Sequence, residues 1–220
     1  MTPNARHWYP RASADRRPSH WWYWGRALYV SRRDYWRIFL KFFLVGLPIG
    51  AAGVLLGVPI LVRTYTRFPL TPLVYRLLFA HAAILMVGGH YSYAEVPLGF
   101  WMQRALGLAR NDYDRIGHVA QGFVPAIVAR EVLLRRSVLS RGGWLFFLVT
   151  SVCLAFSAFY ELVEWWSALA MGEAAKDFLG TQGDPWDTQA DMFSALVGAV
   201  AAQLVLGRLH DRQLARLASR

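Results

Sequence analysis

Acidic and histidine side chains gather at the ends of the hydrophobic segments of this 220-residue chain. They are His90, Glu95, Asp112, Asp114, His118, Glu161, Glu164, Asp184, Asp187 and Asp191. Carboxylates with one or two imidazoles suit a divalent cation such as Zn, Mn or Mg. A histidine held among carboxylates is also a candidate general acid or base near neutral pH. The residue types therefore predict a polar site that binds a cation or transfers a proton.

The segments that carry these groups are long and apolar enough for lipid. The chain is 55% hydrophobic, and its longest uncharged run, residues 42–62, has 21 residues. A bilayer core requires roughly 20 apolar residues per helix. We therefore expect an all-α fold, a polytopic membrane helix bundle. Its five or so hydrophobic segments are at about 42–62, 73–90, 115–134, 144–166 and 188–207.

Consecutive membrane helices run antiparallel, and this arrangement brings the polar groups to one membrane face. That face holds the end of segment 73–90, the start of 115–134, the end of 144–166 and the start of 188–207. Asp114 and His118 are four residues apart and share a helix face. We expect Asp187 to cap the last segment. Asp191, one turn deeper, then requires a cationic partner, because an unpaired charge in a membrane helix is costly.

These positions give a specific set of site residues. We expect His118 to act as the acid or base, oriented by Asp114, with Glu161 and Asp191 completing the catalytic group. The candidate ligands for a divalent metal ion are His90, Glu95, His118, Glu161, Glu164, Asp187 and Asp191. No HExxH or CxxC pattern in the chain identifies a particular metal.

Charge flanking the segments predicts the domains and the orientation. Residues 1–40 form a basic, aromatic tail with an interfacial helix near 22–36. Residues 41–207 form the transmembrane domain, and residues 208–220 form a second basic tail. Loop 167–187 has one Lys and no Arg, which favours the outside and a cytoplasmic C-terminus. The basic N-terminal tail also favours the inside, so segment 42–62 either spans the bilayer or re-enters on one face.

The formal net charge of +10 does not indicate nucleic acid. The basic residues concentrate on both sides of the hydrophobic region, where they face anionic lipid. Trp and Tyr in the N-terminal tail suit the headgroup layer. We therefore expect the lipid bilayer as the main partner and no nucleic acid. The single Cys153 lies inside a hydrophobic segment and excludes an intrachain disulfide.

Four motifs resemble one known family. The stretches GGHYSYAEVPLGFW, RNDYDRIGHVAQGFVPAIVAREVLLR, SAFYELVEWW and GTQGDPWDTQADMFSALVGA are similar to the YjdF-like bacterial inner-membrane proteins, whose function is unknown. The resemblance covers about residues 63–207 and implies a multi-pass inner-membrane protein. More remotely, D-R-x-x-H, then Glu, then D-x-x-x-D-M is similar to VanZ-like envelope proteins, although Ser194 stands where that pattern often has Asn.

Three functions compete for this pattern. The first is a site at the outer membrane face, dependent on a cation, that acts on an amphiphilic envelope substrate. The second is a cation or proton pathway, which the apolar inner halves of the later segments disfavour. The third is a structural or accessory subunit of a larger membrane protein complex, with the N-terminal tail as the docking element. Neither the residues nor the resemblance identifies a reaction.

Overall fold

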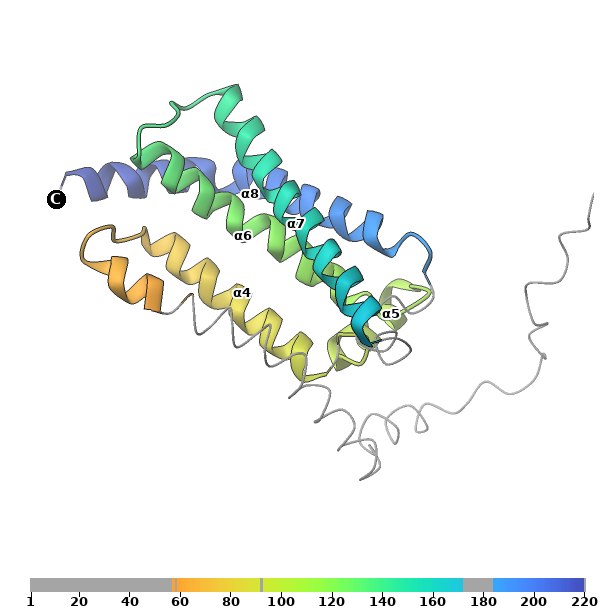
Figure 1. The fold of residues 1–220 in the computed structure, drawn as a ribbon. Coiled ribbons are helices and arrows are strands. Elements are labelled where there is room, and N and C mark those ends of the chain that lie inside the picture. Colours follow the sequence, from red (N-terminus) through yellow and green to blue (C-terminus); the bar gives the residue numbers. More distant parts are fainter. Residues whose placement is uncertain (1–56, 58, 92, 172–183, 220) are drawn as a thin grey trace, which may run out of the picture. The chain divides into compact units, whose positions relative to one another are not determined.

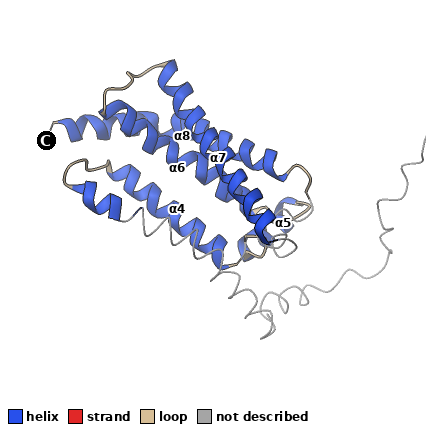
Figure 2. Ribbon diagram, viewed as in Figure 1, coloured by secondary structure: helices blue, strands red, loops and turns tan. Residues whose placement is uncertain are grey.

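The computed structural model describes residues 57, 59–91, 93–171 and 184–219, and every regular element in these ranges is a helix (Figure 2). The helices are α4 (Pro72–His90), α5 (Pro97–Leu106), α6 (Tyr113–Arg135), α7 (Gly143–Met171) and α8 (Asp187–Ala218). Residues 59–65 are also helical. The N-terminal tail and most of the predicted segment 42–62 lie outside the described residues.

Local sequence sets several of these helix ends. Pro72 and Pro97 open α4 and α5, where the missing proline N–H has no intrahelical partner to lose. Gly107 ends α5 in the left-handed conformation, at φ 68°, which glycine adopts without strain. Asn111 then fixes α5 against the start of α6. Its side chain donates to the Val96 carbonyl oxygen and accepts from the N–H of Tyr113.

Helix α6 is the central element and packs most extensively on α8, then on α7 and α4 (Figure 1). Close backbone approach explains the α6–α8 packing. A Cβ at Gly122 would overlap the carbonyl oxygen of Ala195, and one at Gly198 would overlap that of Val119. Small residues of this kind let membrane helices approach each other. The buried core below the crossing includes Ala126, Ile127, Val149, Cys153, Ala199 and Ala202.

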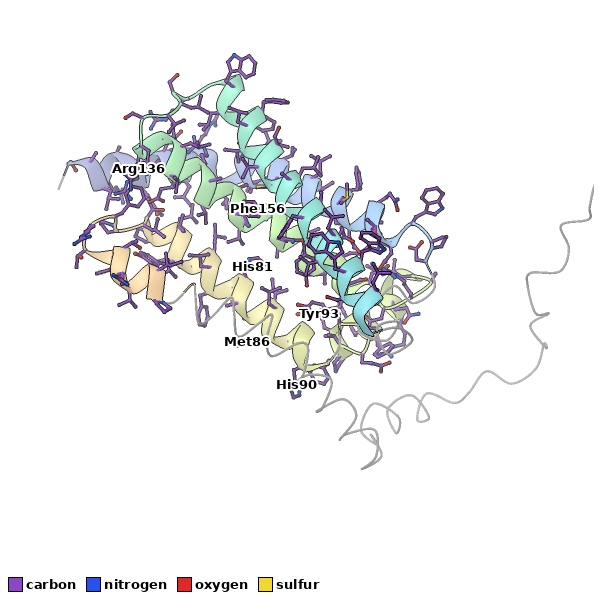
Figure 3. All side chains as sticks on the ribbon, in the orientation of Figure 1. His81, Met86, His90, Tyr93, Arg136 and Phe156 are labelled. Carbon is purple, nitrogen blue, oxygen red and sulfur yellow. The ribbon has the colours of Figure 1, made fainter. Side chains whose placement is uncertain are left out.

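Charged side chains are inside and large apolar ones outside. Asp114, His118, Arg130 and Glu131 of α6 are buried. Large apolar side chains lie on the outer faces of α4, α7 and α8. Met86 is 63% exposed, Phe156 62% and Leu204 70%. Met86 and Phe156 are labelled in Figure 3. This distribution fits lipid as the surrounding solvent.

In the described ranges, three helices are long and apolar enough to cross a membrane: α4, α7 through Leu169, and α8. The predicted count of about five is therefore not reproduced. Helix α6 falls short because its charged residues lower its hydropathy, although burial among the other helices shields them. Helix α8 also continues to Ala218, so residues assigned to a separate basic tail belong to the helix, with His210 and Leu214 buried.

The tight crossing of α6 and α8 gives a first prediction. Gly122→Ala should lower the free energy of unfolding by about 1–3 kcal/mol, because the added methyl group meets the backbone of α8. Gly207→Ala is the control, since open space surrounds a Cβ there and alanine favours a helix by about 1 kcal/mol. Unfolding of both variants in detergent should shift in opposite directions. Equal shifts would contradict the close contact.

Candidate functional site

Three helices contribute the candidate site at one end of the bundle. His118 lies in the second turn of α6, Glu161 in the second half of α7, and Asp191 in the second turn of α8. The antiparallel course of these helices puts the three residues at the same level. All three are buried, with exposed fractions of 7% for His118, 7% for Glu161 and 2% for Asp191. We call them the inner triad.

The imidazole of His118 lies between the two carboxylates of the inner triad. Its Nδ1 is 3.8 Å from Glu161 Oε1, and its Nε2 is 3.7 Å from Asp191 Oδ2. Both distances are too long for a hydrogen bond. His118 Nδ1, Glu161 Oε1 and Asp191 Oδ1 are buried and have no hydrogen-bond partner among the residues that the structure describes. One donor atom from each residue lies within 4.8 Å of the others, a spacing that admits a metal ion.

Arg110 organises a second, more outward set of acids. Its Nη2 lies 2.7 Å from Asp114 Oδ2 and 2.7 Å from Asp187 Oδ1, and its Nε is 2.8 Å from Asp112 Oδ1. Asp114, Asp187 and Asp191 are also spaced as a metal site. The guanidinium group, however, already contacts two of those three carboxylates. A cation therefore has better access to donors in the inner triad.

Arg115 and Asp184 close the outer side of this set. Arg115 Nη2 lies 2.9 Å from Asp184 Oδ2, and the N–H of Trp186 donates to Asp184 Oδ1 at 2.9 Å. The Trp186 N–H, followed by the charges of Arg110 and Arg115, lowers the pKa of the Asp184 carboxyl. Asp184 is thus held ionised, and it ties the chain before α8 to the start of α6.

The structure corrects two predicted roles. Asp187 does not cap α8, because it is the first helical residue and the preceding Trp186 is the N-cap, without a side-chain cap bond. The Asp187 carboxylate contacts Arg110 instead. Asp114 does not orient His118 either. Its oxygens accept from Arg110 Nη2 and from the N–H of Arg115, while His118 faces Glu161 and Asp191.

Three predicted ligands are not in either metal-spaced group. His90 and Glu95 are exposed, and Glu164 is half-buried. His90, labelled at the end of α4 in Figure 3, packs its ring edge-on against that of Tyr91. The chain then turns through Tyr93, at φ 48°, whose ring packs over Gly88. The same ring also lies near Gly117 of α6, so Tyr93 packs between α4 and α6, while His90 is exposed.

The acids at this end outnumber the basic groups that pair with them. The described carboxyl groups here are Asp112, Asp114, Glu161, Glu164, Asp184, Asp187 and Asp191. The guanidinium groups paired with them in the described ranges are those of Arg110 and Arg115. Asp114, Glu161, Asp187 and Asp191 are buried close together, and like charges so placed do not all ionise at low cost. Protons or a bound cation would reduce this cost.

A second polar network, absent from the sequence prediction, lies at the other end of the bundle. Glu131 of α6 is fully buried and accepts from the N–H and hydroxyl of Thr71 and from Arg135 Nη1, at 2.7–3.2 Å. His210 of α8 lies 3.0 Å from Glu131 through Nε2 and 3.0 Å from Arg130 through Nδ1. Arginine only donates. His210 Nδ1 is therefore the acceptor, and the Nε2–H donates to Glu131.

The two polar groups differ in how completely they are bonded. In the Glu131 network each of the charged side chains has a partner, and Arg130 also contacts Asp211 at 2.8 Å. In the inner triad, by contrast, several buried atoms have no hydrogen-bond partner among the described residues. Complete pairing indicates a structural role, whereas unpaired buried groups call for a ligand. The helical spacing of Glu131 and Arg135 was the sequence signal for the Glu131 network, but nothing local pointed to His210.

Comparison with known proteins gives a family. The family of predicted membrane proteins designated DUF2238 matches residues 35–212. The chain is 58% identical to the inner membrane protein YjdF of Escherichia coli (strain K12) over 163 residues, which covers 74% of this chain and 78% of that protein. No solved structure matches. The match covers all the helices described above except the last residues of α8. The chain therefore belongs to the DUF2238 family of predicted membrane proteins, among the relatives of inner membrane protein YjdF.

Proposed function

We propose that this inner-membrane protein binds a divalent cation in the inner triad and uses it on an amphiphilic envelope substrate. The observation that carries the proposal is the set of buried, unpaired donor atoms on His118, Glu161 and Asp191, with donors within 4.8 Å of one another. Leaving such groups unpaired is costly, so a ligand that pairs them stabilises the folded state.

The spacing of the donors supports a cation rather than direct contact. A metal ion about 2.1 Å from each donor holds the donors about 3.0–3.5 Å apart. One ligand atom from each of His118, Glu161 and Asp191 lies within 4.8 Å of the others, so side-chain shifts bring the three into range. One imidazole nitrogen of His118 would then bind the cation together with an oxygen of Glu161 and an oxygen of Asp191.

The surroundings of the triad support an amphiphilic substrate. The ring of Tyr160 lies 6.0 Å from that of His118, and exposed Trp165, Trp166 and Trp186 lie on the same end of the bundle. Tryptophan at a helix end suits the lipid–water interface. A polar head group would therefore reach the triad while its apolar part stays in lipid. A bound cation supplies Lewis-acid chemistry or an activated water at that depth.

Metal analysis of the purified protein tests the proposal. Wild-type protein in detergent, loaded with Mn²⁺ or Zn²⁺ and then desalted, should retain a stoichiometric amount of metal by mass spectrometry. His118→Ala should lose it, because one of three donors is removed. His90→Ala is the matched control, since His90 is exposed and outside the triad. Equal retention by the two histidine variants, or none by wild type, would refute the proposal.

The same proposal places the triad on the outer face and the C-terminus in the cytoplasm. The exposed Arg208, Arg212 and Arg216 near the end of α8 support this orientation, because basic residues flanking membrane helices concentrate inside. A cysteine at Trp186, which is 69% exposed, should react with an impermeant maleimide in intact cells, while one at Ser219 should not. The reverse pattern would invert the orientation. The native Cys153 is buried and stays in both variants.

A role as an accessory subunit rests on the N-terminal tail, residues 1–40. Those residues lie outside the described part of the chain, so no contact or surface in the structure favours this second function. The cation site is therefore the function that the described residues support best.

A further inference from the structure

Ser157 of α7 has a hydroxyl group that the fold leaves without a partner. The residue is 0% exposed, and its Oγ makes no hydrogen bond within the described part of the chain. Several other helical hydroxyls donate to the carbonyl four residues earlier, among them, at 2.8–2.9 Å, those of Thr150, Ser151, Ser167 and Ser194. Such a bond is the usual arrangement for serine inside a helix. Ser157 forgoes it although no water-exposed alternative is open to its side chain.

The position of Ser157 relates it to the inner triad. It precedes Glu161 by four residues, so it lies on the same face of α7, about 6 Å deeper along the helix axis. Four residues beyond His118 on α6 is Gly122, and four beyond Asp191 on α8 is Ala195. Gly122 and Ala195 are in contact. One turn below the triad, the three helices therefore present two small residues and one hydroxyl.

The next turn shows where the polar region ends. Ala126, Cys153 and Ala199, one further turn along the three helices, belong to the buried apolar core. Ser157 is thus the polar residue between the triad and that core. Gly122 and Ala195 carry no side-chain donor atom, so Ser157 is the one of these three positions that offers an oxygen to a ligand of the triad.

We propose that the Ser157 hydroxyl is a fourth ligand of the cation held by His118, Glu161 and Asp191, which rests on the proposed function. A neutral hydroxyl completes the donor set of one nitrogen and three oxygens without adding charge. Oxygen-rich sets favour Mg²⁺ and Mn²⁺, and a serine or threonine hydroxyl is a familiar Mg²⁺ ligand. Ser157 also supplies the selectivity, by disfavouring cations that prefer sulfur.

Replacing the hydroxyl with a thiol gives a direct test. Ser157→Cys loaded with Co²⁺ should show a thiolate-to-metal charge-transfer band in the near ultraviolet, which wild type should lack. Its affinity for Cd²⁺ relative to Mn²⁺ should rise at least about tenfold, because a soft ligand favours the softer ion. Ser157→Ala should bind Mn²⁺ at least about tenfold more weakly than wild type. If the thiol of Ser157→Cys disturbs folding, the Mn²⁺ affinity of Ser157→Ala still tests the role of the hydroxyl.

Two cysteines provide controls for a merely structural effect. Native Cys153 lies one turn deeper in the apolar core, so wild type already contains a nearby thiol that should give no band. Ser194→Cys places a thiol on α8 where the hydroxyl bonds to the Ala190 carbonyl. It should give no band either. If wild type binds Mn²⁺ and the Ser157 variants match it in affinity and spectrum, the role of Ser157 is refuted alone. If wild type binds neither Mn²⁺ nor Co²⁺, the cation site itself is refuted.

Discussion

Replacing Glu131 with alanine is expected to lower the free energy of unfolding by about 3–5 kcal/mol, the cost of breaking a buried ion pair from one side. The Glu131 carboxylate accepts from Thr71, Arg135 and His210, which join α4, α6 and α8. Its removal leaves these donors buried without an acceptor. Denaturant or thermal unfolding of the detergent-solubilised protein measures the loss.

Asp211→Ala is the control for this prediction. Asp211 belongs to the same network through Arg130 and Arg141, but its side chain is 30% exposed. Water can replace it as a partner, so its loss should cost no more than about 1 kcal/mol. Similar losses in the two variants would show that the Glu131 network does not hold the helices together.

The second large effect is expected at Asp191. Asp191→Asn should weaken divalent-cation binding by more than about 100-fold, because it removes a charged ligand rather than one of its supporting groups. The substitution preserves size, and the buried Asp191 Oδ1 forms no hydrogen bond that folding would lose. The variant should therefore remain folded. Titration of purified protein with Mn²⁺, followed by the electron paramagnetic resonance of the free ion, measures the affinity.

Asp187→Asn is the matched comparison, one turn earlier on α8. Asp187 pairs with Arg110 at 2.7 Å and is outside the inner triad. We expect a stability loss from the weakened ion pair, and a smaller loss of cation affinity than in Asp191→Asn. Wild-type affinity in Asp191→Asn would make Asp191 a structural residue and remove the centre of the proposed site.

The contrast between the two ends of the bundle explains why these predictions differ in kind. At the Glu131 end, His210 is bonded to Arg130 on one side and to Glu131 on the other. That end is complete without a ligand, so its variants should affect stability. At the His118 end, unpaired donors remain after folding. Variants of those donors should affect binding more than stability.

The sequence by itself determined that the protein is a helical membrane protein and at which end of the helices the polar groups lie. Apolar runs of bilayer length predict helices because lipid offers the backbone no partner outside them. Antiparallel order then brings His118, Glu161 and Asp191 to one end without any knowledge of packing. Several helix bounds follow closely as well. The predicted segment 73–90 corresponds to Pro72–His90, and 144–166 lies inside Gly143–Met171.

Only the tertiary structure decided which of these groups meet. Arg110, before α6, takes the Asp114 and Asp187 carboxylates that spacing had assigned to His118 and to a helix cap. His90, at the end of α4, is exposed and belongs to neither metal-spaced group. His210 reaches Glu131 across 79 residues because α6 and α8 cross closely at Gly122 and Gly198. Helical period fixes the face that a residue shares with its neighbours, whereas rotation and close approach between helices are set by side chains far apart in the chain.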